Sequence, residues 1–210
     1  MNLPIKFMPL IKLKSDFQKA IKIAATCLKH GGAVVFPTET VYGLGADPFN
    51  TSAVQKIYQL KGRDFNKPLP LIAENLKVVK KFFKVTSVEE RLMKKYWPGA
   101  LTIILKHKNQ LTKFKGIWNQ KEIAVRVSPN KIARDLAGTC GGFIISTSAN
   151  LAGQPECASA QAVVKQFKNK KYQPDLILDA GRLKKSKPST IVKVLKGGKI
   201  EMVRQGEVKI

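Results

Sequence analysis

Residues Gly32 to Leu71 read GAVVFPTETVYGLGADPFNTSAVQKIYQLKGRDFNKPLPL, and the organisation of the chain is clearest in this segment. It opens with a short apolar strand, Ala33 to Phe36, that runs into a polar stretch rich in Thr and Gly. A helical segment follows from about Thr51 to Leu60, and after it comes a basic loop, KGRDFNK. A strand that ends in a small-residue loop, followed by a helix and a cluster of cations, commonly holds an anionic ligand. We therefore expect an anion-binding site in this part of the chain.

Helices and strands alternate along the rest of the chain. Helical spacing and capping residues predict the helices, and short apolar runs predict the strands. The last of these segments, STIVKVLKGGKIEMVRQG, alternates apolar and polar residues on both sides of two glycines and predicts a hairpin. Together these elements predict an α/β domain, a mixed sheet with helices packed on it. The predicted helices are residues 15–30, 51–60, a short one after Asn75, 87–97, 130–137 and 159–168, and the predicted strands are residues 33–36, 69–73, 101–105, 123–127, 143–146 and 176–178.

Several of the predicted helices begin at a capping signal, and Ser159 is expected to cap the last of them. Ser15 is expected to cap the first helix, and Thr51 the second. Ser87 and Glu90 have the spacing of a capping box. Residues 106–120 are polar, basic and irregular, and they predict an exposed loop.

The composition is that of a folded protein with an unusual positive charge. Hydrophobic residues make up 44% and charged residues 25% of 210 residues, which suits one domain with a sizeable core. The formal net charge is +24, and of the 38 basic residues only six are Arg. Such a charge favours polyanions such as RNA, DNA or nucleotides, although a Lys-rich surface also serves solubility alone.

Cysteine usage and hydropathy indicate the compartment. Cys27, Cys140 and Cys157 are odd in number and widely spaced, which argues against a disulfide framework and a structural zinc site and suits a reducing cytosol. The first residues lack the continuous apolar region of a signal peptide, and no apolar run approaches the length of a membrane span. We expect a cytoplasmic protein that does not associate with a membrane.

Several common catalytic and cofactor motifs are missing from the sequence. There is no Walker loop, and the G-x-G of Gly43 and Gly45 fails to continue into a dinucleotide fingerprint, since Pro48 stands at the next required position. There is no G-x-S-x-G elbow and no cysteine in a nucleophile motif. His30 and His107 lie in no metal-ligand spacing and are expected at the surface. The chemistry should therefore depend on positioning and charge stabilisation.

Lys61, Arg63 and Lys67 are the first candidate site residues. They fall within seven residues, after a helix and before a strand. Cations so close together repel one another and are easier to explain if an anion neutralises them; Arg supplies a planar fork and Lys a point charge for phosphate oxygens. The alternative is a solvated loop in an already basic protein.

A second group of candidates follows the strand FIIS. Ser146, Thr147, Ser148 and Asn150 place small hydroxyl and amide groups at the end of this strand, where they can bind a polar ligand or simply form a turn. Arg126 lies inside the apolar strand IAVRV, so it either points to water or pairs with a specific anion such as a carboxylate. Further polar contacts could come from Thr38, Glu39, Thr40 and Tyr42, although turn chemistry explains each one separately.

Several sequence blocks are far more specific together than alone. PTETVYGLG, KGR with KPL a few residues on, WPGALTIIL, AVRV, STSAN, PSTIV and VRQG occur in this order. The series resembles the YrdC-type family of threonylcarbamoyl-AMP synthases in its short, single-domain form. The resemblance covers roughly Ala20 to Gly206 and implies one YrdC-like domain over residues 1–210, with its core at about 20–206. It also implies a twisted mixed β-sheet with flanking helices and a basic concave cleft.

The resemblance implies an activity and its partners. The family joins L-threonine, bicarbonate and ATP into threonylcarbamoyl-AMP and releases pyrophosphate. Other proteins then transfer the threonylcarbamoyl group to the adenosine next to the anticodon of tRNA. Mg²⁺ would be expected on the triphosphate, held by phosphate oxygens and not by protein side chains.

Site residues are carried over by motif. Lys61 and Arg63 form the K-x-R pair and Ser148 and Asn150 the S-x-N pair, which hold the nucleotide phosphates in the family, and Lys61 and Arg63 would stabilise the developing charge. The resemblance places Lys67 and Arg204 at ATP-contacting positions as well, and it places Thr38, Arg126, Ser146, Thr147 and Ser189 around the threonine.

The chain departs from the family pattern at four positions. Asp64 replaces the usual Pro after K-x-R and puts an anion beside the phosphate site, which could weaken nucleotide binding. Ala100 replaces the second Pro of PGP, and Ala152 replaces a Ser after S-x-N. Ile72 stands where longer relatives carry a His. None of these changes removes a charged contact.

Two other functions compete with the synthase interpretation. One is carbamoyl-AMP formation, as in the related domain of the hydrogenase-maturation carbamoyltransferase, whose zinc-binding C-x-x-C motifs are missing here. The other is an RNA-binding module without catalysis, for double-stranded RNA or ribosome assembly, which the +24 charge favours; tRNA is a further possible partner. RNA binding and synthesis can also coexist in one protein.

Overall fold

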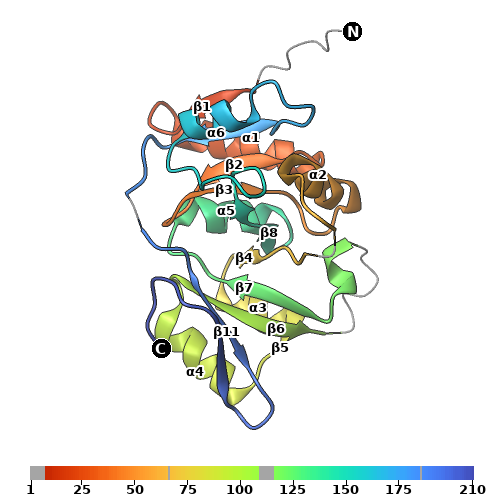
Figure 1. Ribbon diagram of the computed structural model, residues 1–210, viewed down its shortest axis with the longest axis vertical. Helices are drawn as coiled ribbons and strands as arrows, with labels where there is room; N and C mark the ends of the chain where they lie inside the picture. Colours follow the sequence, from red (N-terminus) through yellow and green to blue (C-terminus); the bar gives the residue numbers. More distant parts are fainter. Residues whose placement is uncertain (1–7, 66, 109–115, 185) are drawn as a thin grey trace.

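The computed structural model describes residues 8–65, 67–108, 116–184 and 186–210. Its strands form two mixed sheets with helices packed on them, so the predicted α/β class is confirmed, with the strands divided between two sheets (Figure 1). The α-helices of the described residues are α1 (Phe17–Lys29), α2 (Thr51–Lys61), α3 (Leu76–Phe82), α4 (Ser87–Tyr96), α5 (Lys131–Thr139) and α6 (Ala160–Phe167), and η2 (Gly116–Asn119) is a 3₁₀ helix.

The first sheet has five strands in the order β1-β10-β2-β3-β9. The pairs β1/β10 and β10/β2 are parallel, whereas β2/β3 and β3/β9 are antiparallel. The strands are β1 (Leu10–Lys12), β2 (Val34–Pro37), β3 (Tyr42–Gly45), β9 (Thr147–Ser148) and β10 (Leu176–Asp179).

The second sheet has seven strands, with β12-β11-β6-β7-β4-β8 in order and β5 paired to β6. The predicted C-terminal hairpin is confirmed: it consists of β11 and β12, and β11 joins the sheet by pairing in parallel with β6. The strands are β4 (Leu71–Ala73), β5 (Phe83–Lys84), β6 (Leu101–His107), β7 (Glu122–Arg126), β8 (Phe143–Ile145), β11 (Thr190–Val194) and β12 (Ile200–Arg204).

Burial of β2 on both faces explains its continuous apolar sequence. Val34 and Phe36 belong to the core cluster that includes Ala24 of α1 and Leu136 of α5. Val35, which points to the opposite face, belongs to the larger cluster that extends into the second sheet. Successive side chains of a strand point to opposite faces. When both faces are covered, neither meets water, so every position of the strand is apolar.

The two sheets meet where β3 passes β8. The backbone N–H of Ile145 donates to the carbonyl of Ala46 at 3.0 Å, just beyond the end of β3. A Cβ atom on Gly45 would lie 2.4 Å from the carbonyl oxygen of Ile145 and 2.7 Å from the Phe36 ring. Only glycine permits so close an approach, and it is this approach that brings the polar loops of both sheets together.

Three helix caps differ by one residue from the sequence prediction. Asp16, not Ser15, caps α1, and the Ser15 hydroxyl donates to the carbonyl of Lys12. Asn50, not Thr51, caps α2, and Thr86 with Glu89 forms the capping box of α4 one residue before the predicted pair. In each case two adjacent residues can act as the N-cap, and only the tertiary structure shows after which of them the helix begins.

The predictions for residues 106–120 and for His107 were wrong in part. Strand β6 continues to His107, which is buried and has both ring nitrogens within hydrogen-bond distance of carbonyl oxygens, those of Lys108 and Gln120. Trp118 is fully buried and its indole N–H donates to Pro48. The prediction of an irregular loop at residues 109–115 lies outside the described residues.

No disulfide joins any two of Cys27, Cys140 and Cys157. Within the described ranges no helix combines the length and the apolar character needed to cross a bilayer, and no three His, Cys, Asp or Glu side chains gather as a metal site would require.

Candidate functional site

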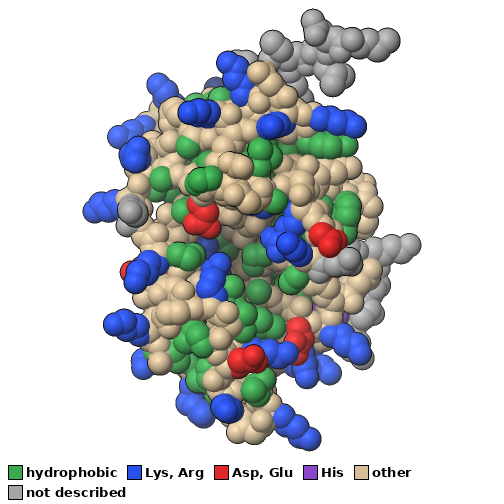
Figure 2. Space-filling model, viewed as in Figure 1, with side chains coloured by type: hydrophobic (Ala, Val, Ile, Leu, Met, Phe, Trp, Pro, Cys, Tyr) green, Lys and Arg blue, Asp and Glu red, His purple; other side chains and the backbone are tan. Residues whose placement is uncertain are grey.

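A pocket with a volume of about 380 Å³ opens between the two sheets, within the size range of about 300–1,000 Å³ typical of small-molecule sites. In Figure 2 it is the hollow at the centre of the face, with Lys and Arg side chains beside it and around the outline of the molecule. Eight of the eleven predicted site residues line it: Thr38, Arg63, Arg126, Ser146, Thr147, Ser148, Ser189 and Arg204. The other three, Lys61, Lys67 and Asn150, do not line the pocket itself.

Lys61 and Arg63 take different positions because α2 ends between them. Lys61 is the last residue of the helix, and Gly62 adopts a left-handed conformation (φ 58°) that turns the chain. Lys61 consequently stays buried beneath the pocket, with 4% of its surface exposed, whereas Arg63 reaches the pocket wall. Glycine suits the turn, since other residues seldom adopt positive φ.

Lys61 holds the S-x-N motif in place. Its Nζ donates to the carbonyl of Ser148 at 2.6 Å and to Oδ1 of Asn150 at 3.0 Å, and the Ser148 hydroxyl donates to the same Oδ1 at 2.6 Å. The Asn150 amide nitrogen in turn donates to the carbonyls of Leu151 and Gln154. Burial, together with the smaller effect of the positive charge of Arg63, lowers the pKa of Lys61 to about 8. The K-x-R and S-x-N motifs therefore form one hydrogen-bonded unit.

Arg63 presents an unsatisfied donor. Its Nη2 donates to the carbonyl of Pro68 at 3.3 Å, whereas its Nε is buried with no hydrogen-bond partner among the residues described. A buried donor left unpaired costs free energy, so it marks a place where a ligand oxygen would be favourable. Lys67, on the same connection, is exposed and lies outside the pocket lining.

Arg126 lies at the end of β7, at the other side of the pocket. It is buried, and its Nη1 pairs with Oε1 of Glu39. Burial, together with the nearby positive charge of Arg204, lowers its pKa to about 10. This pKa is still well above 7, and the guanidinium therefore remains charged at neutral pH. The sequence placed this arginine inside an apolar strand; the structure shows that it points into the pocket and not into water.

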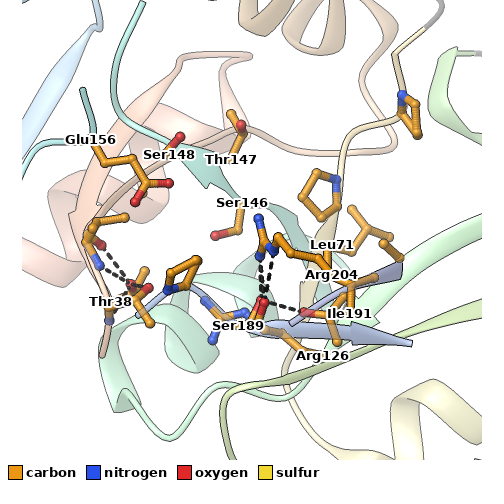
Figure 3. A pocket seen from close by; sticks show the side chains of 18 of the residues that line it. Thr38, Leu71, Arg126, Ser146, Thr147, Ser148, Glu156, Ser189, Ile191 and Arg204 are labelled. Atoms are coloured by element: carbon orange, nitrogen blue, oxygen red, sulfur yellow. Dashed lines mark hydrogen bonds between the residues drawn. The ribbon is translucent and has the colours of Figure 1, made fainter. Parts of the chain in front are cut away.

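The hydroxyl of Thr38 shapes the loop that carries Glu39. It donates to the carbonyl of Val41 at 2.7 Å and accepts from the backbone N–H groups of Thr40 and Val41 (Figure 3). Thr38 thus lines the pocket, but its side chain serves first to fold the turn. Tyr42, the other polar residue singled out in this loop, is buried, and its hydroxyl donates to the carbonyl of Gly181.

Arg204 and Ser189 approach the pocket from the C-terminal hairpin. Nη2 of Arg204 donates to the carbonyl of Ser189 at 2.7 Å, and the Ser189 hydroxyl lies 2.9 Å from that of Thr102. Figure 3 shows both residues near Ser146. The backbone N–H of Ser146 donates to the carbonyl of Pro70, the residue just before β4. Burial lowers the pKa of Arg204. Three arginines from three separate segments therefore surround one cavity.

Glu156 is the pocket residue that sequence reasoning missed. It is exposed, it lines the pocket, and its negative charge raises the pKa values of Lys61 and Arg204, against the effect of burial. It follows the STSAN block in a stretch without a recognisable pattern, so no signal in the sequence pointed to it.

The fold and pocket define the class of the protein: an α/β domain with a pocket that three arginines line. The sequence profile of the Sua5_yciO_yrdC family, described as "Telomere recombination", matches residues 26–206. The chain belongs to this family, as the resemblance of its motifs indicated.

Three relatives illustrate the match. The threonylcarbamoyl-AMP synthase of Psychromonas ingrahamii is 37% identical over 176 residues, which are 82% of this chain and 89% of that protein. The structure of P. abyssi Sua5 complexed with L-threonine has a TM-score of 0.81 at 30% identity and covers 96% of this chain and 58% of that chain. E. coli YciO has a TM-score of 0.79 at 28% identity, with 96% of both chains covered. The chain thus spans little more than half the length of the Sua5 chain but nearly all of YciO.

Proposed function

We propose that this chain is an L-threonylcarbamoyladenylate synthase, a nucleotidyltransferase that forms threonylcarbamoyl-AMP from L-threonine, bicarbonate and ATP. One observation carries the proposal: residues of five sequence blocks far apart in the chain line a single pocket. Arg63 comes from KGR, Arg126 from AVRV, Ser148 from STSAN, Ser189 from PSTIV and Arg204 from VRQG. The names of the relatives and the threonine bound to P. abyssi Sua5 support the same reaction.

Threonine would bind at the Arg126 side of the pocket. A guanidinium has five N–H donors, and within the described residues Arg126 uses one nitrogen, Nη1, for Glu39. Its Nη2 and Nε can therefore receive the carboxylate of the amino acid. Hydroxyl groups of Ser146, Thr147 and Ser189 line the same pocket and suit the polar remainder of the substrate.

The nucleotide phosphates would bind at the Arg63 and Arg204 side. The Nε of Arg63, which has no partner among the described residues, provides a donor, and Ser148 lines the same pocket. Lys61 and Asn150 act through the backbone and side chain of Ser148, which they hold. Lys67, exposed on the same connection as Arg63, would meet the phosphates from the solvent side.

The reaction needs positioning and charge compensation from these residues. The threonine amine adds to bicarbonate with loss of water, and a carbamate oxygen then attacks the α-phosphorus. The bond from this phosphorus to the bridging oxygen breaks and pyrophosphate leaves. Arg63 in the pocket wall, and the charge of Lys61 from beneath the pocket, would offset the negative charge that gathers on the leaving phosphates, and no protein nucleophile takes part.

Mg²⁺ would accompany the triphosphate. It prefers oxygen ligands and keeps several water molecules, so phosphate oxygens can supply most of its contacts. Glu156 is the carboxylate in the pocket lining, and it is the side chain suited to face such an ion. When bound, the ion would neutralise phosphate charge during the displacement.

The wider role proposed here is tRNA modification in the cytoplasm. The product would pass to the proteins that transfer the threonylcarbamoyl group to the adenosine next to the anticodon. The net charge of +24 supports additional contact with tRNA or double-stranded RNA, which would be sensitive to salt.

Pyrophosphate release from ATP tests the proposal directly. Purified protein is assayed with and without L-threonine and bicarbonate, and the nucleotide product is identified by mass spectrometry. Release that needs both compounds, together with threonylcarbamoyl-AMP, is the expected result. Release with carbamoyl phosphate but not with threonine would establish the carbamoyl-AMP alternative, and folded protein that binds RNA without any release would establish the binding module.

A further inference from the structure

The Glu39 carboxylate is held at two points. Oε1 pairs with Nη1 of Arg126, and Oε2 accepts from the hydroxyl of Ser128 at 2.5 Å. Its side chain is 18% exposed, and the guanidinium that it contacts is more deeply buried still. A carboxylate with both oxygens engaged has little freedom to move.

The backbone beneath Glu39 is also fixed. The Thr38 hydroxyl bonds to the backbone on the far side of Glu39, at Thr40 and Val41. The Ser186 hydroxyl lies 3.3 Å from the carbonyl oxygens of Glu39 and Thr40 and donates to them. The loop therefore presents the carboxylate in one orientation, toward the end of β7.

Arg126 needs such a partner. It is a buried cation, and the like charge of Arg204 is close enough to lower its pKa. Its long side chain has many rotamers, and a buried charge without a partner is strongly unfavourable. Among the described residues, Glu39 is the one that forms a hydrogen bond with this guanidinium.

We propose that Glu39 is a positioning residue: it holds Arg126 so that Nη2 and Nε face the pocket and receive the carboxylate of the amino-acid substrate. The identity of that substrate rests on the proposed function, whereas the positioning of Arg126 by Glu39 is independent of it. A rival interpretation is that Glu39 occupies the carboxylate site itself and competes with the substrate. If Glu39 competed with the substrate, its carboxylate would have to leave the site at each turnover. The hydrogen bond from Ser128 and the fixed loop oppose such movement and therefore favour a positioning role.

The test compares Glu39→Gln with a matched control. Glutamine has nearly the same size but no charge, and it cannot accept through both terminal atoms. The control is Glu122→Gln, which also removes a paired carboxylate, at the first residue of β7: Glu122 accepts from Lys193 at 2.6 Å and does not line the pocket. Ser128→Ala, which removes one of the two anchors, is a milder second variant in case Glu39→Gln folds poorly.

The first measurement does not depend on catalysis. Phenylglyoxal modification is followed by peptide mass spectrometry, with the exposed Arg182 as internal reference. We expect Arg126 to react severalfold faster relative to Arg182 in Glu39→Gln, faster to a smaller degree in Ser128→Ala, and at the wild-type rate in Glu122→Gln. Equal relative rates in all four proteins would overturn the proposal.

The second measurement gives the consequence for the substrate. We expect Glu39→Gln to raise the KM for threonine about tenfold or more, with the KM for ATP and kcat within about twofold, as expected for loss of a charge-assisted contact used in substrate binding. A lower KM for threonine would overturn positioning in favour of competition. If wild-type protein shows no threonine-dependent pyrophosphate release, the proposed function fails, and the labelling result still decides whether Glu39 holds Arg126.

Discussion

The ammonium group of Lys61 lies 3.0 Å from Oδ1 of Asn150, so the two motifs expected to hold phosphates hold each other. Both residues are buried under the pocket, and Ser148, which each of them contacts, is the member of this group that lines it. Lys61 therefore acts on the pocket mainly through the position of Ser148.

Burial of Lys61 predicts a pH dependence of stability. Its pKa falls from 10.5 to about 8 in the folded protein, so between these pH values the unfolded chain binds more protons than the folded protein. The free energy of unfolding should then rise with pH in wild-type protein relative to Lys61→Met, by on the order of 2 kcal/mol. Urea unfolding at about pH 7.5 and about pH 10 measures it, and a difference that stays constant with pH would contradict the burial of a charged amine.

Arg126→Ala should impair threonine binding selectively. The variant removes the guanidinium proposed to pair with the substrate carboxylate, so the KM for threonine should rise roughly 10–100-fold while the KM for ATP changes little. Arg126→Lys keeps a charge but loses the planar fork, so its KM for threonine should lie between those of the wild-type protein and Arg126→Ala. Steady-state kinetics with each substrate varied in turn provides the measurement, and equal increases in both KM values would refute the assigned role.

Asp64 should weaken nucleotide binding. It follows Arg63 directly and places a negative charge where the family pattern has Pro. Asp64→Asn should lower the KM for ATP about two- to threefold at low salt, and this gain should shrink as salt screens the charge. Asp135→Asn, which removes a half-buried carboxylate paired with Lys131 on α5, serves as control and should leave the KM for ATP unchanged.

Gly45→Ala should destabilise the junction between the sheets. The added Cβ would lie 2.4 Å from the carbonyl oxygen of Ile145, and backbone atoms there cannot easily move apart. The free energy of unfolding should fall by roughly 1–3 kcal/mol or more in urea titrations. Gly138→Ala is the matched control, because Gly138 is at an exposed position of α5 and its added Cβ would meet only the side chain of Glu74, at 3.3 Å; the stability should change by about 0.5 kcal/mol or less. Similar losses in both variants would argue against the close approach.

Sequence periodicity predicted most elements but not every strand. The apolar run of β2 and the glycine-centred hairpin of β11 and β12 were recognisable because their pattern is local. Strand β3 was missed, since two of its four residues are glycine and its pairing with β2 and β9 arises from contacts distant in sequence. The distribution of strands over two sheets could not be read from the order of elements either.

The candidate site shows the same division between local and long-range information. Motif order predicted which segments converge, and Arg63, Arg126 and Arg204 do line one pocket. It could not predict that Gly62 would turn Lys61 away from the cavity, because that depends on where α2 stops. Nor could it separate the role of Thr38 in folding its loop from direct contact with a ligand.

The hairpin position of Arg204 has a consequence for how the protein is made. The chain leaves the ribosome from its N-terminus, so Arg63 and Arg126 emerge long before β12 can pair with β11, and β11 with β6. Pairing between segments so far apart in sequence is slow, because a long loop must close first. The cavity thus acquires its third arginine only after β11 and β12 have been made, and nascent chains that stop before residue 204 carry the other two arginines of the pocket without the third.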